Sequence, residues 1–357
     1  MTLTEAPQVR DIRTAFAPVI EAIAAGAVER ERNRELPFDE VQLLRDAGFG
    51  ALRVPVEYGG WGITLEQLFT LLIELGEADS NLPQLLRGHI AFVETQRAQP
   101  DSPTRTEWLT RIASGEILFG NAQAERGDSS TPTTNLTEVD GRLLLNGRKF
   151  YSTGTLFADW IWSGAQFGDA FVALAVPADA DGVTRIDDWD GFGQRLTGSG
   201  TTIYRNVEID PAHVLPWSEN DESRPLAYTS GFYQLILLAS LAGIARAVLR
   251  DAVAFVQPRT RTFGIPGNSS PRDEPLVQRV VGRLASIRFS VEATVLEAVR
   301  RLEHADDTRR HDETDDELYC TALVSVYEAQ QVVIDAVLQA TGLLFEVGGA
   351  SAVSVDR

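Results

Sequence analysis

The hydrophobic periodicity of this chain changes twice along its length. Apolar residues recur at helical spacing up to about residue 115, form short alternating runs between about 116 and 217, and return to long helical stretches from Ser230 onward. These patterns indicate different structures, because side chains repeat every 3.6 residues on a helix face and every two residues along a strand. The sequence therefore predicts an α+β protein with three domains: helical residues 1–115, β-rich residues 116–225 and helical residues 226–357.

Local signals place individual elements within these domains. Thr64, followed three residues later by Gln67, predicts a helix that starts at Thr64 and runs through Glu77. Asp140-Gly141 and Asn146-Gly147 are typical of two tight turns. Alternating or apolar runs predict strands at 171–177 and 201–209, and long helices are expected at about 232–257, 274–304 and 313–341.

The charge balance limits the classes of partner. The 357 residues include 51 Asp and Glu against 32 Lys and Arg, a formal net charge of −19. Nucleic-acid phosphates and anionic membrane surfaces both require clustered cationic residues, so neither partner is expected. The longest apolar stretch, Leu235–Leu249, is interrupted by Arg246 and is expected to be too short to span a membrane. With no signal-peptide pattern at the N-terminus, a soluble cytoplasmic protein is predicted.

Few residues are suited to metal or nucleophilic chemistry. Cys320 is the only cysteine, and its apolar helical surroundings predict a buried thiol. His304 and His311 lie in an acidic stretch that favours a solvated helix connection over a metal site. Four scattered histidines provide no Ser-His-Asp arrangement and no metal-ligand spacing, and no Gly-rich segment matches a P-loop or dinucleotide motif. No bound metal is expected.

Three Gly-, Ser- and Thr-rich segments occur in a family-specific order. Residues 54–62, VPVEYGGWG, resemble the motif P-x-E-x-G-G-x-G, and residues 147–154, GRKFYSTG, resemble G-x-K-x-W-I-T-N. Residues 194–209 resemble R-x-T-x-S-G followed by F-x-N-V-x-V. In this order the chain resembles the acyl-CoA dehydrogenase superfamily over nearly its whole length. The resemblance implies an N-terminal helical domain, a middle β-barrel and a C-terminal four-helix bundle, usually in a homotetramer with flavin where the domains meet.

The catalytic base separates two branches of this superfamily. A dehydrogenase needs a carboxylate to remove the α-proton of an acyl thioester. In most members this residue follows the late G-G-x-G segment, but here Gly348-Gly349 is followed only to Arg357, which predicts a truncated or naturally short C-terminal domain. The alternative position on the first bundle helix holds Tyr233, whose phenol is a poor base. Residues 259–263, RTRTF, and 343–350 resemble instead the flavin monooxygenase branch that includes dibenzothiophene monooxygenase.

Resemblance to this branch implies a cofactor and a chemistry. Reduced FMN, with FAD as the alternative, is supplied by a separate flavin reductase and reacts with O2 to form a C4a-hydroperoxide. One oxygen atom then passes to a small apolar or heteroatom-containing substrate. An FAD-dependent acyl-CoA dehydrogenase and a non-catalytic, flavin-poor relative are the alternative functions.

The resemblance also assigns roles to individual residues. Thr153 is expected beside flavin N5 as a catalytic residue, and Arg261 is expected at the flavin phosphate. His89 is expected in a catalytic or substrate-binding role, with Phe92 and Tyr233 also at the substrate. The other expected flavin contacts are Asn121, Ala122, Gln123, Phe150, Tyr151, Ser152, Trp189, Ala350 and Ser351. The structural alternatives are that Thr153 only ends a strand, Trp189 and His89 belong to the core, and Arg261 is a surface residue.

Overall fold

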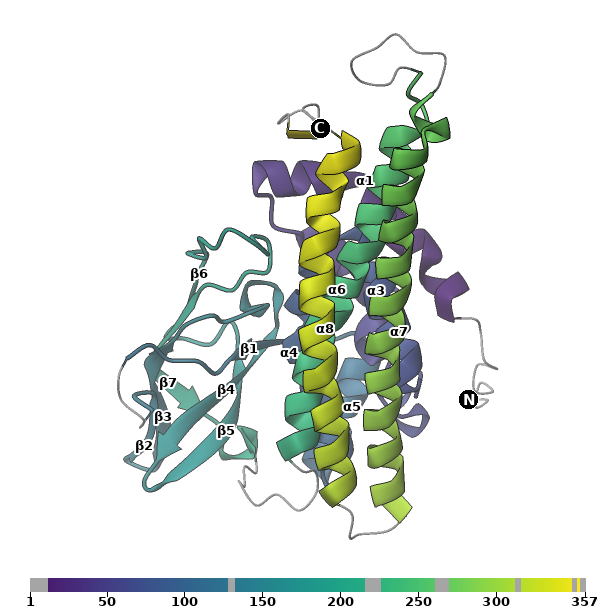
Figure 1. Ribbon diagram of the computed structural model, residues 1–357. Helices are drawn as coiled ribbons and strands as arrows, with labels where there is room; N and C mark the ends of the chain where they lie inside the picture. Colours follow the sequence, from purple (N-terminus) through teal and green to yellow (C-terminus); the bar gives the residue numbers. More distant parts are fainter. Residues whose placement is uncertain are drawn as a thin grey trace, which may run out of the picture. The chain divides into compact units, whose positions relative to one another are not determined.

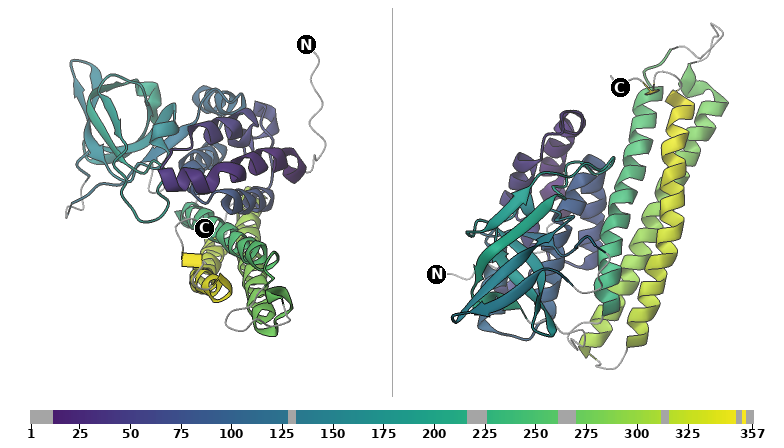
Figure 2. Two further views of the ribbon diagram at one scale, coloured as in Figure 1. Left: turned by 90° about the horizontal axis from the view of Figure 1, so that it is seen from above. Right: turned by 90° about the vertical axis from the view of Figure 1, so that its left-hand side faces the viewer.

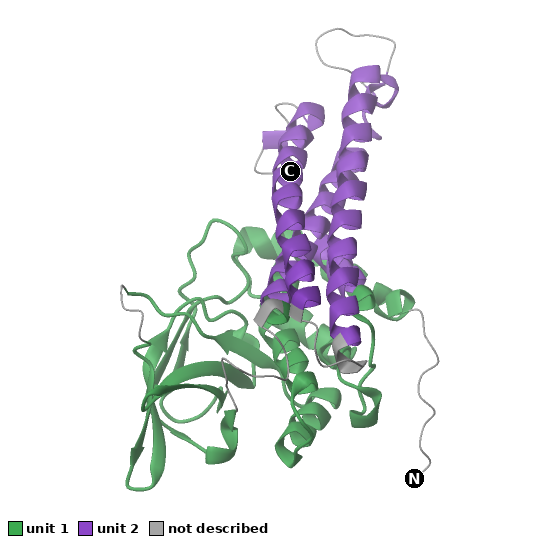
Figure 3. Ribbon diagram, turned by 60° about the horizontal axis from the view of Figure 1, so that its bottom comes forward, with its two compact units in different colours: residues 1–68, 81–229 green, residues 69–80, 230–357 purple. Residues whose placement is uncertain are grey.

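The computed structural model describes residues 12–127, 132–215, 226–260, 270–311, 316–348 and 352–353. The chain forms two compact units, shown in different colours in Figure 3. The first unit contains residues 1–68 and 81–229, and the second contains residues 69–80 and 230–357. Each unit is described separately below.

The first unit combines short helices with a sheet (Figure 1). Its helices are α1 (Ile12–Asn33), α2 (Phe38–Asp46), the start of α3 (Leu65–Ala78), α4 (Asn81–Ala98) and α5 (Pro103–Ala113). Its strands are β1 (Phe119–Ala122), β2 (Asn135–Val139), β3 (Arg142–Lys149), β4 (Trp160–Phe167), β5 (Ala170–Pro177), β6 (Val183–Ile186), β7 (Thr201–Ile209) and β8 (Val214–Leu215). The strands expected at 171–177 and 201–209 are confirmed as β5 and β7.

The predicted start of α3 is confirmed by a reciprocal cap. The Gln67 backbone N–H donates to Thr64 Oγ1 at 3.1 Å, and the Thr64 N–H donates to Gln67 Oε1 at 3.0 Å. These two bonds satisfy donors that the first turn of a helix otherwise leaves unpaired.

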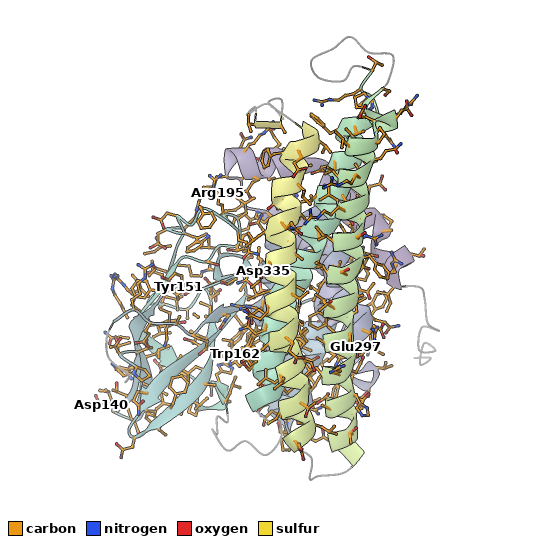
Figure 4. All side chains as sticks on the ribbon, viewed as in Figure 1. Asp140, Tyr151, Trp162, Arg195, Glu297 and Asp335 are labelled. Carbon is orange, nitrogen blue, oxygen red and sulfur yellow. The ribbon has the colours of Figure 1, made fainter. Side chains whose placement is uncertain are left out.

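The sheet has the strand order β6-β7-β3-β2-β4-β5-β8, and β1 also pairs with β4 in parallel. Asp140 and Gly141 join β2 to β3 with positive φ angles of 52° and 77°, which confirms a hairpin turn of the kind that Asp-Gly favours. Figure 4 shows Asp140 at the tip of this hairpin. The sheet is strongly curved in Figure 2, but in the described residues no pairing joins β6 to β8 to close it.

The prediction of a second turn at Asn146-Gly147 is wrong. Both residues lie inside β3, and the pairing of β3 with β7 shifts register between Leu145 and Gly147. Gly147 has a φ of 156°, and Asn146 Oδ1 accepts a hydrogen bond from the Asn206 N–H at 2.8 Å. The Asn-Gly pair therefore forms a β-bulge, in which a glycine relieves the local backbone geometry without reversing the chain.

One face of the sheet forms a continuous apolar core. Side chains from β1 to β7 contribute to it, since alternate residues of each strand point to the same side. The buried residues of this core are Ala122, Leu136, Leu145, Ile161, Ala165, Leu174, Val176, Ala178, Tyr204, Val207 and Ile209. The opposite face of β1 and β4 packs against α4 and α5, as the contacts of Phe119 and Trp160 with Phe92 and Trp108 show.

The second unit contains the long helices expected at the C-terminal end. They are α6 (Leu226–Val256), which belongs to this unit from Ser230 onward, α7 (Pro275–His311) and α8 (Asp316–Gly348). The second half of α3 also belongs to this unit. Arg246 of α6 lies within 3.8 Å of Glu74 and Glu77 of α3 and also pairs with Glu292 of α7. A Cβ on Gly243 would lie 2.4 Å from the Gly76 carbonyl carbon, so the absence of a side chain lets α6 and α3 cross closely.

Two expectations for the helical region need correction. Tyr228–Val256 and Glu317–Gly348 are long and apolar enough to cross a membrane by length and composition, a test that buried core helices of soluble proteins also pass. The apolar helix Tyr228–Val256 is longer than the expected stretch Leu235–Leu249. Arg246 does not end this helix, and its charge is paired with Glu292 within the unit. Cys320 is exposed on α8, since the buried face is formed by neighbours such as Tyr319 and Ala322.

Candidate functional site

Three segments that are distant in sequence meet at one end of the sheet. The Asn121 N–H donates to Thr153 O at 3.0 Å, which joins β1 to the end of β3. The Ser152 N–H donates to Gly200 O at 2.9 Å, and the Gly154 N–H donates to Thr197 O at 3.1 Å. The segments around residues 121, 153 and 199 therefore form one hydrogen-bonded cluster.

Tyr151 presents an aromatic ring at the surface of this cluster. Its φ of 55° lies in the left-handed region, which is costly for a non-glycine residue and occurs more often at functional sites. The side chain is 48% exposed, and its ring lies edge-on to Trp189 with centroids 6.1 Å apart. The Arg126 guanidinium lies 4.6 Å from the Phe150 ring centroid and 5.0 Å from that of Tyr151. Figure 4 labels Tyr151 on the ribbon.

Trp189 belongs to a segment that is held by an ion pair with Arg34, the residue that follows α1. The Trp189 indole N–H donates to Gln194 O at 3.0 Å. Arg34 binds both carboxylate oxygens of Asp187, at 2.7 and 2.8 Å, and donates to Trp189 O at 3.1 Å. This bidentate contact lowers the pKa of Asp187, chiefly through the hydrogen bond from Arg34. Sequence reasoning missed Arg34, because 153 residues separate it from Asp187.

The hydroxyl of Thr153 and two neighbouring polar atoms lie in the same cluster. Thr153 Oγ1 is 2.7 Å from Ser199 Oγ, and both side chains are buried. Asn121 Oδ1 and Ser152 Oγ are buried without a hydrogen-bond partner. A buried polar atom without a partner is costly, so such atoms indicate a place where a bound group completes the hydrogen bonding.

An ion pair between buried Lys149 and half-buried Glu125 holds the chain next to this cluster. Lys149 Nζ is 2.6 Å from Glu125 Oε1 and also donates to Gln123 O at 3.2 Å. Burial alone would raise the pKa of Glu125, but hydrogen bonds from Lys149, Thr133 and Thr134 lower it to about 2. Glu125 therefore stays ionised and ties Thr133 to the end of β3.

Ala122 and Gln123 were expected to contact the flavin, but their side chains are engaged within the protein. The Ala122 side chain is part of the sheet core, so only its backbone remains available to a bound group, and its carbonyl already accepts from Ser163 Oγ at 2.8 Å. Gln123 Nε2 donates to Trp162 O at 3.1 Å. Strand alternation explains this, because Asn121 and Ala122 point to opposite faces of β1.

His89 is buried in α4 with both ring nitrogens occupied by backbone groups. The Phe119 N–H donates to Nδ1 at 3.2 Å, so Nε2 carries the proton and donates to Gly50 O at 3.0 Å. Burial lowers the pKa of His89 to about 4, which keeps the ring neutral. This arrangement favours the structural role, because neither nitrogen is left for a substrate.

Phe92 is fully buried one turn further along α4. Its ring stacks on Phe119 with centroids 3.6 Å apart and meets Trp108 and Trp162 edge-on. These contacts assign Phe92 to the aromatic core between α4 and the sheet. The expected contact of Phe92 with the substrate stays a prediction.

The remaining expected residues lie elsewhere. Tyr233 lies half-buried on α6, in the second unit. Arg261, Ala350 and Ser351 lie outside the described residues.

A cavity of about 340 Å³ lies beside the α4–α5 connection. Its lining includes Gln96 and Arg105 together with Trp162 of β4 and Ala173 of β5. Trp162 is the register partner of Asn121, so the two side chains lie on the same face of the sheet. The Trp162 indole N–H has no hydrogen-bond partner. The volume of the cavity is sufficient for a small organic molecule.

Comparison with known proteins identifies the fold and the branch. Residues 7–116 match the family model for the acyl-CoA dehydrogenase N-terminal domain. The chain is 28% identical over 353 residues to dibenzothiophene monooxygenase of Rhodococcus erythropolis, covering 91% of this chain and 81% of that protein. The N-terminal part of the chain therefore matches the acyl-CoA dehydrogenase family model, and most of the chain is similar to a flavin monooxygenase.

Further relatives come from the monooxygenase branch of the superfamily. A probable FMNH2-dependent monooxygenase, SfnC of Pseudomonas putida, is 26% identical over 296 residues, or 79% of this chain and 73% of that protein. The solved structure of FMN-bound TdsC from Paenibacillus sp. A11-2 has a TM-score of 0.87 at 23% identity, covering 96% of this chain and 88% of that one. The structural likeness supports the superfamily fold, and the named relatives favour the flavin monooxygenase over the dehydrogenase.

Proposed function

We propose that the protein is a reduced-FMN-dependent monooxygenase that transfers one oxygen atom from O2 to a small apolar or heteroatom-containing substrate. The observation that carries the proposal is the convergence of β1 with the motif segments 147–154 and 194–209 in one hydrogen-bonded cluster. Relatives of this branch match more than nine-tenths of the chain.

The residues of the cluster are suited to hold FMN. Tyr151 offers an exposed ring face, and Asn121 offers a carbonyl oxygen that lacks a partner. Thr153 and Trp189 lie beside them, and Arg261, Ala350 and Ser351 are proposed to complete the site. Reduced FMN supplies the electrons that activate O2, and the protein supplies orientation and exclusion of water. A separate flavin reductase is proposed to deliver the reduced cofactor.

The chemistry of the relatives suggests the substrate class. Their names include dibenzothiophene monooxygenase and L-evernosamine nitrososynthase, which act on a sulfur compound and on an amino sugar. We expect a substrate of this chain to carry a sulfur or nitrogen atom that accepts oxygen.

Self-association is proposed on the basis of α8. Five large apolar residues at heptad spacing are exposed along it: Val324, Tyr327, Ile334, Leu338 and Phe345. Such a seam is typical of helices that pack against a second helix, here proposed to come from further copies of the chain in a homotetramer. Light scattering is expected to give a mass several times 39.1 kDa, and Leu338→Glu is expected to lower it. A monomeric wild-type protein would contradict this assembly.

We also propose the finer architecture, which is a closed barrel, a four-helix bundle and the domain limits 1–115, 116–225 and 226–357. A cytoplasmic location is proposed as well. The strong curvature of the sheet and the grouping of α3 with α6, α7 and α8 support the first two parts. An experimental structure with bound FMN would test them, since an open sheet there would exclude the barrel.

Turnover in 18O2 tests the proposed activity. With FMN, a flavin reductase and NADH, one labelled atom is expected in the product and the other in water. Label confined to water and hydrogen peroxide would oppose the proposal.

A further inference from the structure

Three buried hydroxyls form a row that ends at the candidate flavin site. Thr153 Oγ1 is 2.7 Å from Ser199 Oγ, and Ser199 Oγ is 2.7 Å from Thr197 Oγ1. Thr197 Oγ1 donates to Gln194 O at 3.0 Å. The Ser152–Gly200 and Gly154–Thr197 backbone bonds hold the two segments in register, so the row is built into the fold.

Donor counting gives the row a direction. A carbonyl oxygen only accepts, so the single hydroxyl proton of Thr197 goes to Gln194 O. Thr197 Oγ1 then accepts from Ser199, and Ser199 Oγ accepts from Thr153. The alternative acceptor for Thr153, Tyr151 O, is 3.4 Å away and therefore forms a weaker bond. Thr153 thus donates its proton into the row and keeps its oxygen lone pairs as acceptors.

The far end of the row is fixed in place. Gln194 O also accepts the Trp189 indole N–H at 3.0 Å, and Gln194 has a left-handed φ of 50°. Thr197, Thr153 and Ser199 are only 1%, 3% and 8% exposed. Water therefore has little access to these hydroxyls and cannot readily reverse the direction of their hydrogen bonds.

We propose that Ser199 and Thr197 are positioning residues that hold Thr153 as a hydrogen-bond acceptor and so make the site prefer reduced over oxidised FMN. Reduced flavin carries a hydrogen on N5, whereas oxidised flavin has a lone pair there. An acceptor at Thr153 complements only the reduced form. This inference rests on the proposed function and on the position beside flavin N5 that the family resemblance gives Thr153.

Anaerobic titrations with oxidised FMN and with dithionite-reduced FMN test the proposal. The measured quantity is the ratio of the two dissociation constants, which is unrelated to turnover. In Thr197→Val, the Ser199 proton loses its acceptor and turns to Thr153, whose own proton then points outward. The preference for reduced FMN is expected to fall by about tenfold, the effect of roughly one hydrogen bond. This corresponds to a potential of bound FMN lower by about 30 mV for a two-electron couple.

Further variants separate hydrogen bonding from packing. Ser199→Ala breaks the row at its middle and is expected to lower the same ratio. Thr197→Ser retains the hydroxyl and should keep the wild-type ratio. Thr137→Val, an exposed threonine on β2, is the matched control and should also leave it unchanged. Thermal unfolding of each variant verifies that it is folded.

The outcomes distinguish the positioning role of Ser199 and Thr197 from the monooxygenase proposal. A lowered ratio in Thr197→Val and Ser199→Ala, with both controls unchanged, supports the positioning role. Variants that bind FMN with the wild-type ratio overturn that role and leave the monooxygenase proposal standing. A wild-type protein that binds FMN in neither redox state overturns the proposed function and this inference together.

Discussion

Glu94→Gln is expected to lower the free energy of unfolding by about 3–5 kcal/mol, because it removes a buried carboxylate charge that pairs with Arg53 and Arg97. Glu94 Oε1 lies 2.7 Å from Arg53 Nε, and the Arg97 guanidinium lies within 3.0 Å of both carboxylate oxygens. The Tyr228 hydroxyl donates to Oε2 at 2.7 Å. Glu94 itself is 3% exposed, so water has little access to the site to compensate for the loss of the carboxylate charge.

Urea unfolding of the wild type and the variant measures this difference. Glu57→Gln is the matched control, because Glu57 is exposed and its replacement should change the free energy of unfolding by no more than about 0.5 kcal/mol. A Glu94→Gln protein as stable as the control variant would show that the network does not stabilise the fold.

Acidification is expected to destabilise the protein through His89, by about 3 kcal/mol between pH 6.5 and 4. In the native state burial lowers the pKa of His89 from 6.5 to about 4, so the ring stays neutral over this interval. The unfolded chain takes up a proton near pH 6.5 that the native protein does not bind until near pH 4. The contribution is therefore complete above pH 6.5 and is lost as the pH falls.

The contribution of His89 is isolated by comparison with His89→Gln, which does not titrate. Free energies of unfolding are measured for both proteins at intervals from pH 7 to 4, so that the titration of carboxylates common to both cancels. The advantage of the wild type is expected to shrink as the pH falls. Parallel pH profiles would contradict the burial of a neutral His89.

Elements whose signals are local were predicted from the sequence. The Thr64–Gln67 cap and the Asp140-Gly141 turn depend on residues at most three apart, and both formed as expected. Asn146-Gly147 carries the same local signal but forms a bulge, because β3 continues its pairing with β7 on both sides of it. Tertiary pairing therefore decided between two structures that the dipeptide alone permits.

The candidate site was predicted in part, for a related reason. The resemblance placed Asn121 and Thr153 at the flavin but did not include Ser199, because the hydroxyl row depends on side chains that are 46 residues apart. The sequence also left the environment of His89 and Phe92 open, because a helix face that points to a site and one that packs on a strand have the same periodicity. Only the contacts with Gly50 and Phe119 assign both residues to the interior.

The most direct test of the monooxygenase proposal is the oxygen-isotope balance of turnover. The protein, catalytic FMN, a flavin reductase and NADH are incubated under 18O2 with a panel of small sulfur- and nitrogen-containing compounds, and products are analysed by mass spectrometry. A reaction without the protein corrects for oxidation by free reduced flavin. We predict a protein-dependent product containing one atom from 18O2, with the second atom in water. Label found only in water and hydrogen peroxide for the whole panel, at the rate of the protein-free control, would contradict the account.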